Sequence, residues 1–97
     1  MKYRIEVAPD ASRQFHGLSA YDRAKVRCAI DEHLAKHPTQ ESKSRIKRLR
    51  ELKKPQYRLR IDDLRVFYDV DGETVIVLGV MAKVHAEDWL REEGERT

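Results

Sequence analysis

YRLRIDDLRVFYDV, residues 57–70, predicts a β-hairpin with three arginines on one face. Aliphatic and aromatic residues alternate with charged ones on both sides of a central Asp-Asp pair, which is typical of two strands joined by a two-residue turn. In this register Arg58 pairs with Phe67, and Arg60 pairs with Arg65. A slip of one residue would send the arginines to the opposite face, so the prediction depends on the turn.

The pairing of Arg60 with Arg65 is unfavourable, because like charges directly opposite each other on a sheet repel unless an anion lies between them. Guanidinium groups bind phosphate through two parallel hydrogen bonds, and several of them on one phosphodiester would stabilise the charge that develops during its cleavage. The alternative is an exposed face on which Asp62, Asp63 and Asp69 neutralise the arginines. The phenylalanine of the same face could stack on a base or belong to the core.

The chain on either side of this hairpin predicts further strands. VDGET contains Asp71 and Gly72, a pair typical of a type I′ turn, and leads into the apolar run of residues 74–80. Such a run is typical of a central strand covered on both faces. Residues 2–9, KYRIEVAP, alternate apolar and charged side chains and predict a half-buried strand that ends at Pro9.

Two helices are expected after this first strand. Asp10 is the predicted N-cap of a short helix that closes near Gly17. Ser19 and Asp22 resemble a capping box at the start of a longer helix, which cannot continue through Pro38. The two helices are expected to run antiparallel, as a hairpin.

Two segments remain. Residues 39–56 are polar and basic, and Ile46, Leu49 and Leu52 are their available anchors to a core. The three-residue spacing of these anchors predicts a helical turn or an irregular connector. Residues 86–95, AEDWLREEGE, predict a short helix that stops at glycine.

The order of these elements is strand, helix, helix, strand, strand, strand and short helix. It predicts the α+β class: a small, mainly antiparallel sheet with an N-terminal helical hairpin on one face and a short C-terminal helix. A chain of 97 residues builds a single core, so we expect residues 1–97 to form one domain.

Charge is segregated along the chain. Residues 43–65 hold ten Lys or Arg against three acidic residues, a net charge of +7. The whole chain carries only +3, so the rest carries −4. A surface of this kind attracts polyanions such as nucleic acid, although a solvated basic face without a partner is the alternative.

Several classes of site are disfavoured by the residues present. Cys28 is the single cysteine, which excludes an intramolecular disulfide, and the four histidines do not have the spacing of metal ligands. We therefore expect no metal and no cofactor. There is also no N-terminal apolar run of signal-peptide length and no stretch near the ~18 apolar residues of a membrane span, so a cytoplasmic protein without membrane contact is expected.

Two stretches carry a family resemblance. Residues 55–70, PQYRLRIDDLRVFYDV, and residues 75–90, VIVLGVMAKVHAEDWL, resemble the RelE/ParE superfamily of toxins from type II toxin-antitoxin pairs of bacteria and archaea. The shared pattern is a Tyr, two basic residues alternating with aliphatics, a short turn, an Arg, and a second Tyr three residues later. The resemblance extends over nearly the whole chain and is closest to the RelE branch.

The resemblance to the RelE branch implies inhibition of translation by cleavage of messenger RNA in the ribosomal decoding site. The protein would then be a metal-independent endoribonuclease (an mRNA interferase), in which the 2′-hydroxyl attacks the adjacent phosphate and basic residues replace the usual histidine pair. The ParE branch, which inhibits DNA gyrase and need not retain a nuclease site, is the alternative. A third class is a non-catalytic basic RNA-binding domain.

The same resemblance implies roles for individual residues. Arg58 and Arg60 match the paired basic residues that bind phosphate and assist proton transfer, and Arg65 matches the arginine that steadies the scissile phosphate. Lys83 falls where that branch generally has arginine, which keeps the charge but loses bidentate geometry. The four are the candidate catalytic residues.

Trp89 falls at or near a tyrosine position of the family, and indole can stack on a base but cannot exchange a proton as a phenol can. His85, two residues beyond the lysine, is a substitute acid or base by residue type, or an incidental surface histidine. The candidates for substrate binding are Trp89, His85, Lys53, Lys54 and Arg50.

The resemblance also implies partners. The first is a cognate antitoxin whose acidic or partly disordered segment wraps the toxin and folds on binding. The ribosome and its messenger RNA follow from the RelE branch, and operator DNA is contacted only through the antitoxin complex. Folded alone, the toxin is expected to expose apolar surface that the antitoxin covers.

Overall fold

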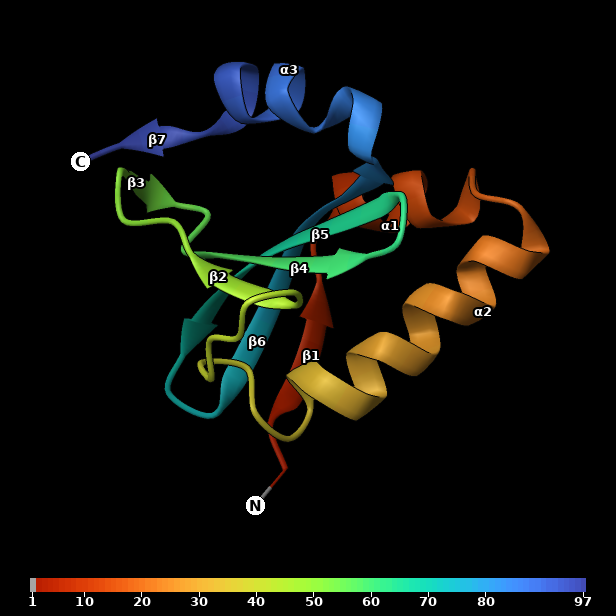
Figure 1. The fold of residues 1–97 in the computed structure, drawn as a ribbon, viewed down its shortest axis with the longest axis horizontal. Coiled ribbons are helices and arrows are strands. Elements are labelled where there is room, and N and C mark those ends of the chain that lie inside the picture. Colours follow the sequence, from red (N-terminus) through yellow and green to blue (C-terminus); the bar gives the residue numbers. More distant parts are fainter. Residues whose placement is uncertain (1) are drawn as a thin grey trace.

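A computed structural model describes residues 2–97, and its main feature is a five-stranded sheet (Figure 1). The strands of this sheet are β1 (Arg4–Val7), β2 (Ile46–Arg48), β4 (Tyr57–Ile61), β5 (Leu64–Asp71) and β6 (Thr74–Ala82). Their order is β1-β6-β5-β4-β2, and only the β1–β6 pair is parallel. The predicted α+β class with a mainly antiparallel sheet is confirmed.

The β4–β5 hairpin has the predicted register. Arg58 pairs with Phe67, and Arg60 pairs with Arg65. The turn is tight because Asp62 takes a left-handed conformation with φ of 49°, which aspartate tolerates better than most residues. The local sequence therefore set the register of this hairpin.

The β5–β6 hairpin turns one residue later than predicted. Asp71 still pairs with Thr74, so the two loop residues are Gly72 and Glu73, and only the glycine has a positive φ, of 60°. A glycine at the first loop position is typical of a type II′ turn, so the predicted type I′ turn is wrong. A shift in the β5–β6 pairing after Phe67 accompanies this turn.

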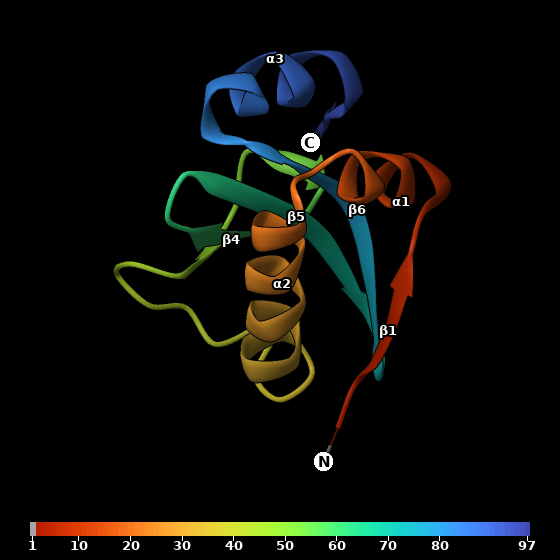
Figure 2. The same ribbon diagram turned by 90° about the vertical axis from the view of Figure 1, so that its right-hand side faces the viewer.

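The N-terminal helices lie on one face of the sheet (Figure 2). They are α1 (Pro9–His16) and α2 (Ala20–Ala29), which continues as the short π-helix η1 (Ile30–Leu34). Ser19 caps α2 by accepting a hydrogen bond from the Asp22 N–H, as predicted. The predicted N-cap Asp10 is wrong, because Pro9 already occupies the first helical position, where its missing N–H costs nothing. The helical hairpin is open, since Figure 1 shows its two helices diverging rather than lying side by side.

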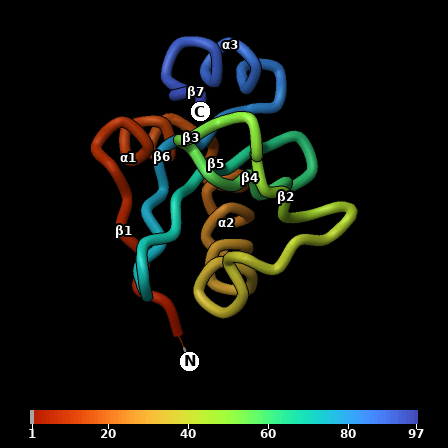
Figure 3. The backbone as a smooth tube through the Cα atoms, turned by 90° about the vertical axis from the view of Figure 1, so that its left-hand side faces the viewer, coloured from red at the N-terminus to blue at the C-terminus, as the bar shows by residue number. Residues whose placement is uncertain are grey.

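Residues 39–56 contain two short strands in an otherwise irregular connector, so of the two predicted alternatives the helical turn is wrong. β2 pairs with β4, and β3 (Leu52–Lys54) pairs with β7 (Glu95–Arg96) at the far end of the chain. Figure 3 shows β7 above β3. Ile46 and Leu52 are buried anchors, as expected. The three-residue spacing of the anchors is compatible with a helical turn. Residues 46–48 form a strand because they pair with the edge of β4.

The C-terminal helix α3 (Lys83–Glu93) begins three residues before the predicted start at residue 86. Its N-cap, Ala82, has no capping side chain, so the sequence carried no start signal. The Lys83 N–H instead donates to the Asp63 carbonyl at 2.6 Å, which connects the helix start to the β4–β5 turn. The helix ends before Gly94, as predicted.

The main core lies between the sheet and the N-terminal helices. Tyr68 is fully buried there, and its hydroxyl donates to the Pro38 carbonyl at 2.6 Å. Burial raises the pKa of this phenol. The other buried members of this cluster are Ala11, Val26, Ala29, Leu34, Ile46, Leu59, Ile61, Leu64, Val66, Val75, Val77 and Val80. Between residues 2 and 97, no helix has the length and apolarity needed to cross a membrane.

Candidate functional site

Three arginines lie on the sheet face opposite α2. Successive side chains of a strand point to opposite faces, so Leu59 and Ile61 enter the main core while Arg58 and Arg60 point away from it. Arg65 joins them from β5. We call Arg58, Arg60 and Arg65 the arginine face. In Figure 3 α2 lies behind the strands and α3 runs along the top of the face turned to the viewer.

Arg65 is the most buried member, with 6% of its surface exposed. Its Nη1 donates to the carbonyls of Asp62 at 2.8 Å and Leu64 at 2.9 Å, which fixes the guanidinium beside the turn. Burial, and then the positive charges of Arg58 and Arg60, lower the pKa of Arg65. A buried cation among other cations is costly, so the site favours an anion.

Arg58 is partly buried and has an unused donor. Its Nε is buried and has no hydrogen-bond partner within residues 2–97. Burial and the neighbouring Arg60 lower the pKa of Arg58. Buried polar atoms in native proteins nearly always have a hydrogen-bond partner. A ligand acceptor that reaches this Nε would therefore remove the free-energy cost of leaving a buried donor unsatisfied.

The nearby carboxylates form no ion pair with the arginine face within residues 2–97. Asp63 acts on it only through its charge: burial and then the other two arginines lower the pKa of Arg65, and Asp63 raises it by less. Asp62 Oδ2 forms an ion pair with Lys25 Nζ of α2 at 2.8 Å, and the hydrogen bond from this lysine lowers the pKa of Asp62. Asp69 Oδ1 accepts from the Gln56 N–H at 2.8 Å. Within the described chain, none of the ion pairs includes a member of the arginine face. Asp62 and Asp69 are thus engaged elsewhere, and Asp63 offsets only part of the positive charge.

An aromatic stack lies next to the arginine face. Phe67 is 1% exposed and stacks on Trp89 of α3, with ring centroids 5.0 Å apart and planes inclined by 16°. The indole also covers Gly79, where an added Cβ would lie 2.7 Å from its Cζ2 atom. Phe67 thus belongs to the interior, the second of its two predicted alternatives. Trp89 packs α3 against the sheet, and its predicted substrate-binding role stays a prediction.

Lys83 and His85 lie at the margin. Both are exposed in the first turn of α3, and Lys83 is positioned near the β4–β5 turn by its backbone hydrogen bond to Asp63. The His85 ring takes part in no hydrogen bond or ion pair with residues 2–97. Their predicted catalytic and substrate-binding roles stay predictions.

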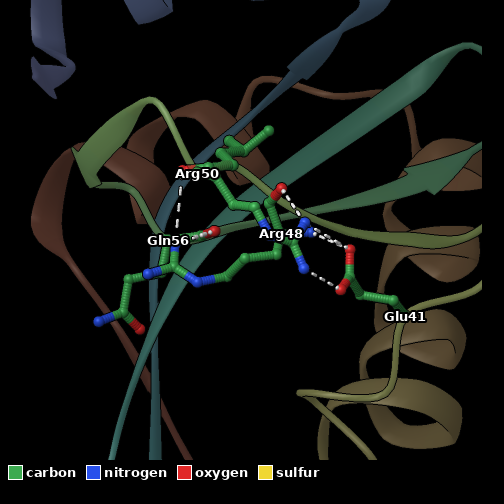
Figure 4. Close-up of polar contacts among 5 residues, drawn as sticks. Glu41, Arg48, Arg50 and Gln56 are labelled. Atoms are coloured by element: carbon green, nitrogen blue, oxygen red, sulfur yellow. Dashed lines mark hydrogen bonds and ion pairs between the residues drawn. The ribbon is translucent and has the colours of Figure 1, made fainter. Parts of the chain in front are cut away.

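Lys53 and Lys54 are exposed on β3, outside the arginine face. Arg50, predicted to bind substrate, is engaged by a carboxylate (Figure 4). Its Nη2 donates to Glu41 Oε2 at 2.8 Å, and the Arg48 N–H donates to Glu41 Oε1 at 3.0 Å. Glu41 therefore fastens the loop before β2 to the loop after it.

This contact predicts a pH dependence of folding stability. The hydrogen bonds from Arg50 and then Arg48 lower the pKa of Glu41 to about 2 from an ordinary value of 4.5. A lowered carboxyl pKa stabilises the fold above pH 4.5, and this contribution is lost as the pH falls toward 2. Glu41→Gln should therefore lower the urea midpoint at neutral pH and match the wild type near pH 2. A midpoint difference that stays constant with pH would contradict the assignment.

Sequence reasoning missed Lys47. This lysine is exposed on β2 and pairs directly with Arg58 of β4, so both side chains lie on the same face of the sheet. The alternation of Arg45 and Lys47 around the buried Ile46 was the available signal. The described residues contain no group of three His, Cys, Asp or Glu able to hold a metal ion.

Comparison with known proteins relates the chain to toxins. Residues 5–87 match the family described as ParE toxin of type II toxin-antitoxin system, parDE. No curated protein matches the sequence.

Solved structures share the fold. A chain of the toxin-antitoxin complex RelBE2 from Mycobacterium tuberculosis superposes with a TM-score of 0.69 at 22% identity, covering 84% of this chain and 99% of that one. A chain of the archaeal RelE-RelB complex from Pyrococcus horikoshii OT3 gives 0.69 at 21% identity, covering 86% and 97%. A chain of the RelB-RelE antitoxin-toxin complex from Methanococcus jannaschii gives 0.63 at 20% identity, covering 87% and 96%. Because the family match spans most of the sequence and the fold is that of the RelE complexes, the chain belongs to the ParE toxin family of type II toxin-antitoxin systems, within the RelE/ParE superfamily.

Proposed function

We propose that this toxin inhibits translation by ribosome-dependent cleavage of messenger RNA, as a metal-independent endoribonuclease. The observation that carries the proposal is the arginine face: three guanidinium groups on adjacent strands with no carboxylate partner within residues 2–97. One of their donors, the Arg58 Nε, is buried and unused. A phosphodiester supplies the negative charge and the acceptors that this face lacks.

In the proposed reaction the 2′-oxygen bonds to phosphorus while the bond from phosphorus to the 5′-oxygen breaks. The proton of the 2′-hydroxyl ends on the leaving 5′-oxygen, and the products are a 2′,3′-cyclic phosphate and a 5′-hydroxyl. Negative charge grows on the phosphoryl oxygens in the transition state, where preorganised donors act most strongly. Arg65 is preorganised by its two carbonyl contacts, and Arg58 offers the buried Nε donor that has no partner within residues 2–97.

The partners follow from this proposal. A cognate antitoxin covers the arginine face with an acidic or partly disordered segment, and operator DNA is contacted only through that complex. The structural neighbours are themselves toxin-antitoxin complexes, which supports such a partner. The ribosome and its messenger RNA are the targets of the free toxin, in the cytoplasm.

The second candidate function is inhibition of DNA gyrase without nuclease activity. The match of residues 5–87 to the ParE toxin family favours it. Lys83 and Trp89 favour it as well, because they stand where the RelE branch generally carries arginine and tyrosine. The candidates differ in the macromolecule that is damaged, so one pair of assays separates them.

The test is primer extension on an abundant messenger RNA from cells that briefly express the toxin without its antitoxin, beside an Arg65→Ala variant. The proposal predicts discrete new 5′ ends within translated codons for the wild type and none for the variant. Growth arrest with intact messages and relaxed plasmid DNA would establish gyrase inhibition instead. Full toxicity of Arg65→Ala would show that the arginine face is not the site.

A further inference from the structure

A cleft of about 460 Å³ lies between the β2–β3 segment and α3. Its walls come from segments far apart in the sequence, which β3 and β7 hold together by pairing. Its basic lining residues are Lys47, Arg48, Arg50, Arg91 and Arg96. We call this the β2–α3 cleft.

The β2–α3 cleft continues the arginine face outward. Lys47 lines the cleft and is also the direct cross-strand partner of Arg58, one strand spacing of about 4.8 Å away. Paired residues share a face, so a ligand on Arg58 can extend to Lys47 without crossing the sheet. The order Arg65, Arg58, Lys47 thus runs from β5 over β4 to β2 and into the cleft.

The β2–α3 cleft has a positive net charge, and some of its basic side chains form no ion pair within residues 2–97. Five basic residues and two acidic residues line the walls. Arg50 is held by Glu41 and Arg91 by Asp88. Lys47 and Arg96, by contrast, take part in none of the ion pairs formed within residues 2–97. These two cations of the cleft, without an ion-pair partner among the described residues, attract an anionic ligand.

We propose that the β2–α3 cleft binds the phosphodiester backbone of the single-stranded RNA next to the scissile nucleotide, with Lys47 and Arg96 as phosphate contacts. This inference rests on the proposed function, since it concerns the RNA strand that the arginine face would cleave. Among residues 2–97, the cleft is lined by three leucines and by no aromatic side chain, so it offers no stacking platform for bases. Phosphate contacts without base contacts position a strand but do not read its sequence. The cleft therefore sets the register of the strand on the arginine face, not the choice of codon.

The test is the salt dependence of RNA binding by the folded toxin. A fluorescein-labelled 2′-O-methyl RNA of twelve nucleotides, which cannot be cleaved, is titrated with protein at several salt concentrations and followed by fluorescence anisotropy. Each phosphate contact on a single strand contributes about 0.7 to the slope of log K against log salt. Lys47→Ala should lower the slope by about 0.7, and Lys47→Ala combined with Arg96→Ala should lower it by about 1.4. The matched control is Lys36→Ala, an exposed lysine just after η1 on the helical side, which should leave the slope unchanged.

The outcomes separate this inference from the proposed function. RNA binding with an unchanged slope in both variants overturns the cleft assignment, whereas the primer-extension result with Arg65→Ala is independent of it. Absence of RNA binding by the wild type also overturns it. A twelve-residue peptide of alternating Glu and Leu serves as the second probe. If the peptide binds and the RNA does not, and Lys47→Ala weakens the peptide, the cleft takes an acidic protein segment instead of RNA.

Discussion

Replacing Arg65 with methionine should abolish growth arrest and messenger RNA cleavage while leaving the thermal stability of the toxin unchanged or raised. On the proposed function the loss follows from the position of the guanidinium beside Arg58 and Arg60, where it would contribute donors and charge to the transition state. Removing one preorganised donor of this kind typically costs roughly 10²–10³ in rate. The gain or neutrality in stability follows because a buried charge next to like charges opposes folding, and methionine keeps the apolar stem without the charge.

The measurements are the cleavage rate on programmed ribosomes and the midpoint of thermal unfolding by circular dichroism. Arg4→Met is the control for activity, because Arg4 also lies on a strand of the same sheet but on β1, away from the arginine face, and unlike Arg65 it is exposed. It should cleave like the wild type. A large drop in the unfolding midpoint of Arg65→Met would show that this arginine is structural and that the loss of activity has another cause.

Replacing Trp89 with alanine should destabilise the toxin by about 2–4 kcal/mol and release α3 from the sheet, because the substitution removes both a large apolar contact and an aromatic stack. Gly79 would no longer be covered by the indole, and Phe67, which is 1% exposed in the wild type, would become accessible to solvent. Activity should fall together with stability. Trp89→Phe should keep most of both, since a phenyl ring can still stack on Phe67.

Urea unfolding and cleavage assays on the same preparations check this expectation. Gly79→Ala is the matched variant, because its added Cβ would lie 2.7 Å from the indole and displace it without removing it. It should resemble Trp89→Ala in stability. If Trp89→Phe folds as stably as the wild type but no longer cleaves RNA, the indole touches the substrate and the anchoring role is incomplete.

The parts of the fold that were predictable are those decided within a few residues. Alternation in residues 57–70 and the tolerance of Asp62 for a left-handed backbone set the β4–β5 register. The start of α2 was predictable as well, because the Ser19 side chain caps it by accepting a hydrogen bond from the N–H of Asp22, three positions away. The turn at Gly72 was misplaced by one residue, because a glycine can take either loop position and only the β5–β6 pairing decides between them.

The parts that were not predictable depend on distant contacts. Residues 46–48 became a strand because β4 offered a free edge, and residues 52–54 did so because β7 reached them from the other end of the chain. The start of α3 at Lys83 depends on a carbonyl of Asp63 rather than on a capping side chain. The packing of Trp89 on Phe67 and Gly79 was not predictable either, since nothing near Trp89 in sequence indicates that these two residues lie beneath it, and its substrate-binding role stays a prediction.

The sequence by itself determined the fold class, through the order of its elements, and also the register of the central hairpin and the common face of Arg58, Arg60 and Arg65, because a period of two and a short turn fix these last two locally. Only the tertiary structure decided that Asp62 and Asp69 contact other residues instead of those arginines, and where α3 lies. It also decided that Lys47 extends the basic face into a cleft. The physical reason is that burial and charge pairing depend on distances between segments remote in sequence, and those distances exist only once the sheet and α3 have assembled.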